Sequence, residues 1–159
     1  IGYIMQKVVI FDGTILENIN YANKDISKEE IIEICKKLNL HDKIMSLKNG
    51  YETTISSDTD IFSAGEKQLL NFTRVMVENP EIIILDEATA SLSYKSEMMV
   101  RKAIEEITKG KISFIIAHRL STIKKCDKIL LMKDGKIIEE GNHNELMNKQ
   151  GKYYELVNI

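Results

Sequence analysis

Short apolar runs alternate with helical patterns along this 159-residue chain, and that alternation restricts its fold more than any other feature. Ile82–Leu85 and Ile112–Ala117 are apolar runs of strand length, whereas Ser93–Thr108 between them has the period of a helix. The apolar side of that helix holds Val100, Ala103, Ile104 and Ile107. Uninterrupted apolar strands are typical of parallel sheets that are covered on both faces. We therefore predict an α/β fold with a mostly parallel sheet flanked by helices.

Capping boxes mark the beginnings of two helices in the first half of the chain. Ser27–Leu38 and Ser63–Glu78 each open with a serine that is followed three positions later by a glutamate. The second helix is expected to end before Pro80, because proline disfavours a helical residue ahead of it. Residues 49–61 are polar and are predicted to form a loop, and the short run Ile1–Met5 reads as the end of a strand.

The last third of the chain is predicted to hold a β-hairpin, a helix and a short tail. Asp134-Gly135 is a favourable hairpin turn between two strand-like segments. Asn142 and Glu145 have the spacing of a helix cap, and Tyr153-Tyr154 reads as part of a tail.

Charge and hydropathy exclude several classes of function. The formal net charge of −2 gives no broad basic surface, so no nucleic-acid partner is predicted. No apolar run approaches the roughly 18 residues that a membrane-spanning helix needs. Cys35 and Cys126 lie far apart within patterned segments, and we predict reduced, buried thiols in place of a disulfide.

Asp86-Glu87 follows a buried strand, at the sheet edge where α/β proteins bind ligands. One carboxylate there can hold Mg²⁺, which prefers few protein oxygens and keeps much of its water. The second can orient or deprotonate an attacking water. Taken alone, the pair is better explained by an acidic start to a helix.

Three further segments are candidates for polar contacts. Ser63-Ala64-Gly65-Glu66 opens a helix, where free N–H groups can bind an anion, although an ordinary capping box explains the same residues. His118 follows a predicted strand and can donate to a phosphate oxygen, whereas an isolated histidine is more often structural. Gln6 can meet a water on a metal ion, but says little by itself.

The order of these segments resembles the nucleotide-binding domain of ATP-binding cassette (ABC) transporters, of the exporter type. Gln6 is similar to the Q-loop glutamine, and residues 11–19 are similar to the exporter sequence that follows it. Residues 62–68 resemble the signature motif, 82–87 the Walker B strand, 90–93 the D-loop and 117–122 the switch-histidine segment. Each motif is weak alone, but their order along nearly the whole chain is specific.

The resemblance implies a P-loop NTPase fold that is present only in part. A helical subdomain with the signature motif would cover about residues 14–80, and residues 1–13 and 81–159 would form a partial catalytic core with a C-terminal hairpin. The missing strand and helix would leave apolar sheet surface exposed, so we expect a marginally stable monomer or self-association. The chain opens at Ile1 within an apolar run, and we expect it to be a piece cut from a longer domain.

The resemblance also implies residue roles, cofactors and partners. ATP and Mg²⁺ would be held with Asp86 and Gln6 on the metal side, Glu87 as the general base and His118 as the switch residue. Nucleotide contacts would come from Gln6, Ser93 and the signature residues Ser63, Ala64, Gly65 and Glu66. A second nucleotide-binding domain would pair head to tail, and a transmembrane domain would hold the pair at the cytoplasmic face of the cell membrane.

Departures from the family pattern leave alternatives open. The chain has no G-x-x-x-x-G-K-[S/T] phosphate loop, so alone it is expected to bind ATP poorly and hydrolyse it negligibly. Ala64, Glu66 and Ser93 replace the usual glycine, glutamine and aspartate, which suggests a weakened site in an asymmetric heterodimer. A non-catalytic module that donates its signature helix is the main alternative. A soluble cassette ATPase of DNA repair or translation is a further one.

Overall fold

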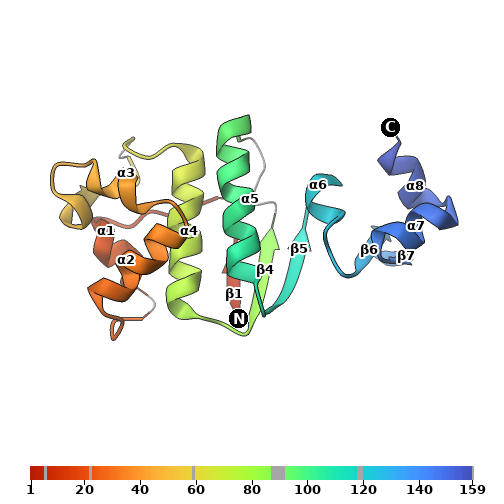
Figure 1. Ribbon diagram of the computed structural model, residues 1–159, viewed down its shortest axis with the longest axis horizontal. Coiled ribbons are helices and arrows are strands. Elements are labelled where there is room, and N and C mark those ends of the chain that lie inside the picture. Colours follow the sequence, from red (N-terminus) through yellow and green to blue (C-terminus); the bar gives the residue numbers. More distant parts are fainter. Residues whose placement is uncertain (6, 22, 59, 87–91, 118–119, 159) are drawn as a thin grey trace. The chain divides into compact units, whose positions relative to one another are not determined.

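The computed structural model describes residues 1–5, 7–21, 23–58, 60–86, 92–117 and 120–158 (Figure 1). They form two compact units, Ile1–Ile116 and Ala117–Ile159, and each is described by itself.

A parallel three-stranded sheet organises the first unit. Its strands β1 (Gly2–Ile4), β4 (Ile82–Asp86) and β5 (Ile112–Ile116) lie in the order β1-β4-β5. Ile4 pairs with Leu85, and Leu85 pairs with Ile115, so β4 is the central strand. The predicted parallel α/β arrangement is confirmed.

Two long helices, α4 (Ala64–Glu78) and α5 (Tyr94–Thr108), share one core with the sheet. Val100, Ala103, Ile104 and Ile107 of α5 are buried, as the helical period predicted. The sheet contributes Ile4, Ile83 and Leu85 to the same core, and these three side chains are almost fully buried. Alternate residues along the strands therefore point toward the helices.

The opposite face of the sheet is apolar and open. On β5, Ile112, Phe114 and Ile116 are 61%, 57% and 52% exposed, and Tyr3 of β1 is 50% exposed. The prediction that the β5 segment is buried was therefore wrong, and on β4 the alternate residues are only half-buried. The described helices of this unit pack on one face only, which confirms the expected exposure of apolar sheet surface.

A segment of short helices and two short strands follows β1 within the first unit. It contains β2 (Gly13–Thr14), α1 (Ile15–Asn20), α2 (Lys28–Lys37), α3 (His41–Met45), the 3₁₀ turn η1 (Gly50–Glu52) and β3 (Thr54–Ile55). The capping box of α2 is confirmed, because the Ser27 side chain accepts from the Glu30 N–H at 3.2 Å. The loop predicted over residues 49–61 is structured in part, since β3 pairs with β2. Tyr51 is buried there, with its hydroxyl 3.0 Å from His41 Nδ1.

One buried guanidinium joins α4 to the segment that follows β1. Arg74, 9% exposed, donates from Nε to the Asn18 carbonyl at 2.6 Å and from Nη2 to Asn18 Oδ1 at 2.7 Å. It also donates to the Val9 carbonyl at 2.5 Å and lies 5.2 Å from the Phe11 ring centroid. Burial lowers the pKa of Arg74. These neutral oxygens stabilise the cation in place of a carboxylate.

The second unit contains α6 (Leu120–Ile123), the hairpin β6 (Ile129–Lys133) and β7 (Lys136–Gly141), α7 (His143–Lys149) and α8 (Lys152–Val157). The predicted turn is confirmed, because Asp134 and Gly135 both have positive φ. The predicted tail was wrong: it forms α8, where the Glu139 carboxylate accepts the N–H groups of Lys152 and Tyr153. Tyr153 is buried beside Ile129 and Leu146.

Both cysteines are free thiols. The prediction that they are buried is confirmed for Cys35 and wrong for Cys126, which is only half-buried. Cys35 is buried within the core of the first unit, and burial raises its pKa to about 11. Within the described ranges, every helix is too short or too polar to serve as a transmembrane span.

Replacing Arg74 with methionine tests whether its hydrogen bonds stabilise the first unit. The loss of the guanidinium would leave the Asn18 and Val9 oxygens without this donor, so we expect Arg74→Met to lower the free energy of unfolding by about 3 kcal/mol. Urea unfolding measures the effect, and Lys102→Met at an exposed position of α5 is the control, with a change below about 0.5 kcal/mol. Equal losses in the two variants would contradict the assignment.

The open sheet face predicts self-association of the isolated chain. We expect Phe114→Lys to weaken association at least about tenfold, because burying roughly 100 Å² of aromatic surface contributes about 2.5 kcal/mol. Sedimentation velocity over a concentration series measures it. Tyr94→Lys removes an aromatic side chain that is 81% exposed on α5, and it is expected to leave association unchanged. A monomer at all concentrations before any substitution would disprove the prediction.

Candidate functional site

Asp86 is the last residue of the central strand, and its side chain is half-buried at the carboxyl edge of the sheet. The Tyr3 hydroxyl, from the neighbouring strand β1, donates to Asp86 Oδ2 at 3.2 Å. The negative charge of Asp86 raises the pKa of the Tyr3 phenol. Asp86 therefore has one oriented oxygen, while Oδ1 remains for another ligand. Glu87, the second predicted carboxylate, lies outside the described residues.

The donor set at this edge fits Mg²⁺ bound mainly through water and phosphate. Among the described residues, no group of three or more histidine, cysteine, aspartate or glutamate side chains is arranged to hold a metal ion. A closed protein cage is therefore not formed by these residues. Mg²⁺ commonly uses only one or two carboxylates and takes its other oxygens from water and substrate phosphates. Asp86 can supply such a carboxylate, whereas Gln6 lies outside the described residues.

The beginning of α4 carries the predicted signature residues. Ser63 is its N-cap: the Ser63 side chain accepts from the Glu66 N–H at 3.3 Å, and the Glu66 carboxylate accepts from the Ser63 N–H at 2.7 Å. The capping-box interpretation of these residues is confirmed. Ser63 and Ala64 are exposed at the tip of the helix, so this tip is accessible for an intermolecular contact.

Gly65 is buried, and its lack of a side chain allows α4 to pack closely on α5. A Cβ atom at this position would lie 2.7 Å from the Cβ of Ser96 and 3.0 Å from its hydroxyl. Helix packing thus requires glycine here, in addition to any role in approach to a phosphate. The sequence did not reveal this constraint, because it depends on the contact between two helices.

Ser93 lies close to the same helix contact. It is the N-cap of α5, and its side chain accepts from the Ser96 N–H at 3.3 Å. Ser96 in turn packs against Gly65, so the predicted D-loop serine and the predicted signature residues lie at one end of the helix pair. Figure 1 shows that α4 and α5 begin at the end of the first unit where β4 finishes. His118 lies outside the described residues, and its place in the site stays a prediction.

Two residues near these segments were missed by sequence reasoning. Tyr3 could not be connected with Asp86 before the register of β1 and β4 was known. Arg74 carried a detectable signal, because it is a charged residue within the mostly apolar stretch of α4 between Leu69 and Val77.

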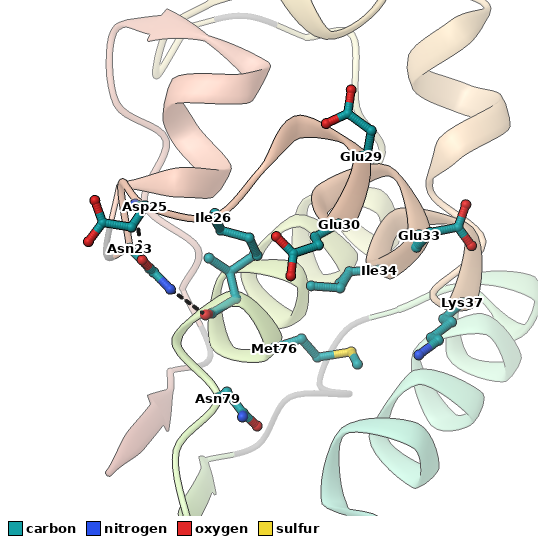
Figure 2. Close-up of a pocket in the computed structure, with 11 residues that line it drawn as sticks. Asn23, Asp25, Ile26, Glu29, Glu30, Glu33, Ile34, Lys37, Met76 and Asn79 are labelled. Atoms are coloured by element: carbon teal, nitrogen blue, oxygen red, sulfur yellow. Dashed lines mark hydrogen bonds between the residues drawn. The ribbon is translucent and has the colours of Figure 1, made fainter.

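A surface cavity elsewhere in the first unit is unsuited to nucleotide phosphates. It has a volume of about 630 Å³ and lies between α2 and the end of α4 (Figure 2). Ile26, Ile34 and Met76 line it, and its charged lining residues are Asp25, Glu29, Glu30, Glu33 and Lys37. Four carboxylates against one lysine would repel an anion.

Comparison with known proteins identifies the family of this chain. Residues 1–90 match the family model described as ABC transporter. The chain is 45% identical over 157 residues to ABC transporter B family member 4 of Dictyostelium discoideum. The matched region covers 99% of this chain and 20% of that protein. It is 42% identical over 156 residues to an ATP-dependent lipid A-core flippase of Syntrophus aciditrophicus, covering 98% of this chain and 26% of that protein.

A third relative is a fatty acid ABC transporter ATP-binding/permease protein of Mycobacterium bovis, 40% identical over 98% of this chain and 25% of that protein. The chain thus spans about a quarter of the length of these curated relatives. Because the family match covers more than half of its 159 residues, this chain belongs to the ABC transporter family.

Proposed function

We propose that this chain is part of the ATP-binding and ATP-hydrolysing domain of an ABC-type exporter, where it powers transmembrane transport. The observation that carries the proposal is the position of Asp86, half-buried at the carboxyl end of the central parallel strand. The relatives named as a lipid A-core flippase and as a fatty acid transporter support a role in transmembrane transport.

The proposed reaction is attack of a water on the γ-phosphorus of ATP, which releases ADP and phosphate. Glu87 takes the proton of the attacking water as general base. Asp86 would hold Mg²⁺, and Gln6 would contact a water bound to the ion. The bound ion would neutralise negative charge on the phosphate oxygens. His118 donates a hydrogen bond to the γ-phosphate. Apart from the proton transfer to Glu87, these residues act by positioning the reactants and stabilising charge.

The proposed assembly is a head-to-tail pair of nucleotide-binding domains attached to a transmembrane domain at the cytoplasmic face of the membrane. In such a pair, the α4 tip faces the nucleotide that is bound by the partner domain. The exposure of Ser63 and Ala64 supports this contact, because the dipole at a helix N-terminus favours an anion. Ser93 is proposed to contact the nucleotide from the same end of the helix pair.

A non-catalytic module that donates α4 to a partner's site is the second candidate. The exposed tip of α4 at Ser63 and Ala64 is what such a module would offer, and the Glu66 carboxylate bound to the Ser63 N–H would weaken the attraction of this tip for a nucleotide. Upstream sequence with a glycine-rich phosphate loop would favour the enzyme, and its true absence from the whole protein would favour the module.

Substitutions at the two adjacent carboxylates test the proposed hydrolysis. In the full-length transporter we expect Glu87→Gln to lower Mg-ATP turnover by about 10²- to 10⁴-fold while ATP binding is retained, because the general base is lost. Asp86→Ala is expected to lower turnover and to raise the Mg²⁺ concentration required. For the 159-residue chain alone, turnover should not exceed that of an Asp86→Ala, Glu87→Gln variant. Full turnover in transporter carrying Glu87→Gln would disprove the role of Glu87.

Comparing the same substitution in each half of the transporter distinguishes a symmetric pair from an asymmetric one. Glu87→Gln is made in this domain and the matching change in the partner. Unequal losses support one strong and one weak site, whereas equal losses argue against asymmetry.

Gly65→Ala separates helix packing from approach to the nucleotide. The added methyl would contact Ser96, so we expect it to lower the free energy of unfolding by about 2 kcal/mol. Adding Ser96→Gly should restore most of that loss, and Ser96→Gly alone is the control. If the backbone at Gly65 also approaches phosphate, ATPase activity of the restored transporter should stay low. Recovery of full activity would assign Gly65 to packing alone.

A further inference from the structure

We propose that Tyr3 is a positioning residue that orients the Asp86 carboxylate toward Mg²⁺. The inference rests on the proposed function, and it adds a residue from β1 to the metal side of the site.

The register of the sheet places the two side chains together. Tyr3 is the partner of Ile84 in the β1–β4 pair, and Asp86 lies two residues further along β4, on the same face as Ile84. A tyrosine side chain is long enough to reach a diagonal neighbour. Its hydroxyl donates to Asp86 Oδ2 at 3.2 Å, across 83 residues of sequence.

The phenol is chemically suited to hold a metal-binding carboxylate. It donates a hydrogen bond without carrying positive charge, so the full negative charge of Asp86 remains available to a cation. A lysine or arginine in its place would neutralise that charge and repel Mg²⁺. Hydrogen bonds from residues behind a metal ligand fix the orientation of the ligand and raise metal affinity. Because only Oδ2 accepts from Tyr3, Oδ1 can face the ion or its water.

Tyr3→Phe removes only the phenol hydroxyl, and its effect on metal affinity tests the inference. In the full-length transporter with a non-hydrolysable ATP analogue, Mn²⁺ can substitute for Mg²⁺, and electron paramagnetic resonance measures the concentration of free Mn²⁺. We expect Tyr3→Phe to weaken Mn²⁺ binding about tenfold, the lower end of the effect of such outer partners. ATP-analogue affinity without metal should be unchanged. Tyr154→Phe, an exposed phenol of α8 in the second unit, is the matched control.

Asp86→Asn in the same assay separates this inference from the proposed function. If Asp86→Asn leaves Mn²⁺ affinity unchanged, the metal role of Asp86 is wrong and both proposals are overturned. If Asp86→Asn weakens binding but Tyr3→Phe matches Tyr154→Phe, only the positioning role is overturned. The double variant should bind no more weakly than Asp86→Asn alone, because Tyr3 acts through that carboxylate. An additional loss in the double variant would show that Tyr3 acts by another route.

Discussion

Pairing of β4 between β1 and β5 is the constraint on which the rest of the first unit depends. Parallel strands bring their carboxyl ends to one edge, and β4 ends there in Asp86. The same pairing sets Tyr3 beside that carboxylate. It also fixes the face on which Ile83 and Leu85 meet the shared core with α4 and α5. A shift of one residue in the register of β1 would turn Tyr3 toward the helices and separate it from Asp86.

Contacts between the helices and loops bring distant parts of the sequence to this edge. Gly65 lets α4 approach Ser96 of α5, which groups the cap of α4 with the cap of α5. Arg74, near the other end of α4, holds the segment after β1 through the Asn18 and Val9 oxygens. A displacement of the segment after β1 would therefore shift α4 as well, because several hydrogen bonds from the buried Arg74 cation connect them. This connection links the strand that carries Tyr3 to the helix whose tip is proposed to face a partner domain.

Local chemistry could be predicted from the sequence, whereas contacts between distant segments could not. The caps at Ser27 and Ser63 and the turn at Asp134-Gly135 depend on residues within a few positions, and all three were predicted. Exposed apolar sheet surface was expected, but its location at Phe114 of β5 was not, because an apolar strand has the same pattern whether or not a layer covers it. The hydrogen bonds from Tyr3 to Asp86 and from Arg74 to Asn18 join residues 83 and 56 positions apart. The predicted group of Gln6, Glu87 and His118 lies outside the described residues and stays a prediction.

A crystal structure of the full-length transporter with Mg²⁺ and a non-hydrolysable ATP analogue would show where the nucleotide lies relative to β4. We predict that Asp86 lies on the metal side of the phosphates, with Glu87 next to the position of the attacking water and His118 beside the γ-phosphate. Nucleotide bound away from the carboxyl edge of β4, with these three side chains dispersed, would contradict it.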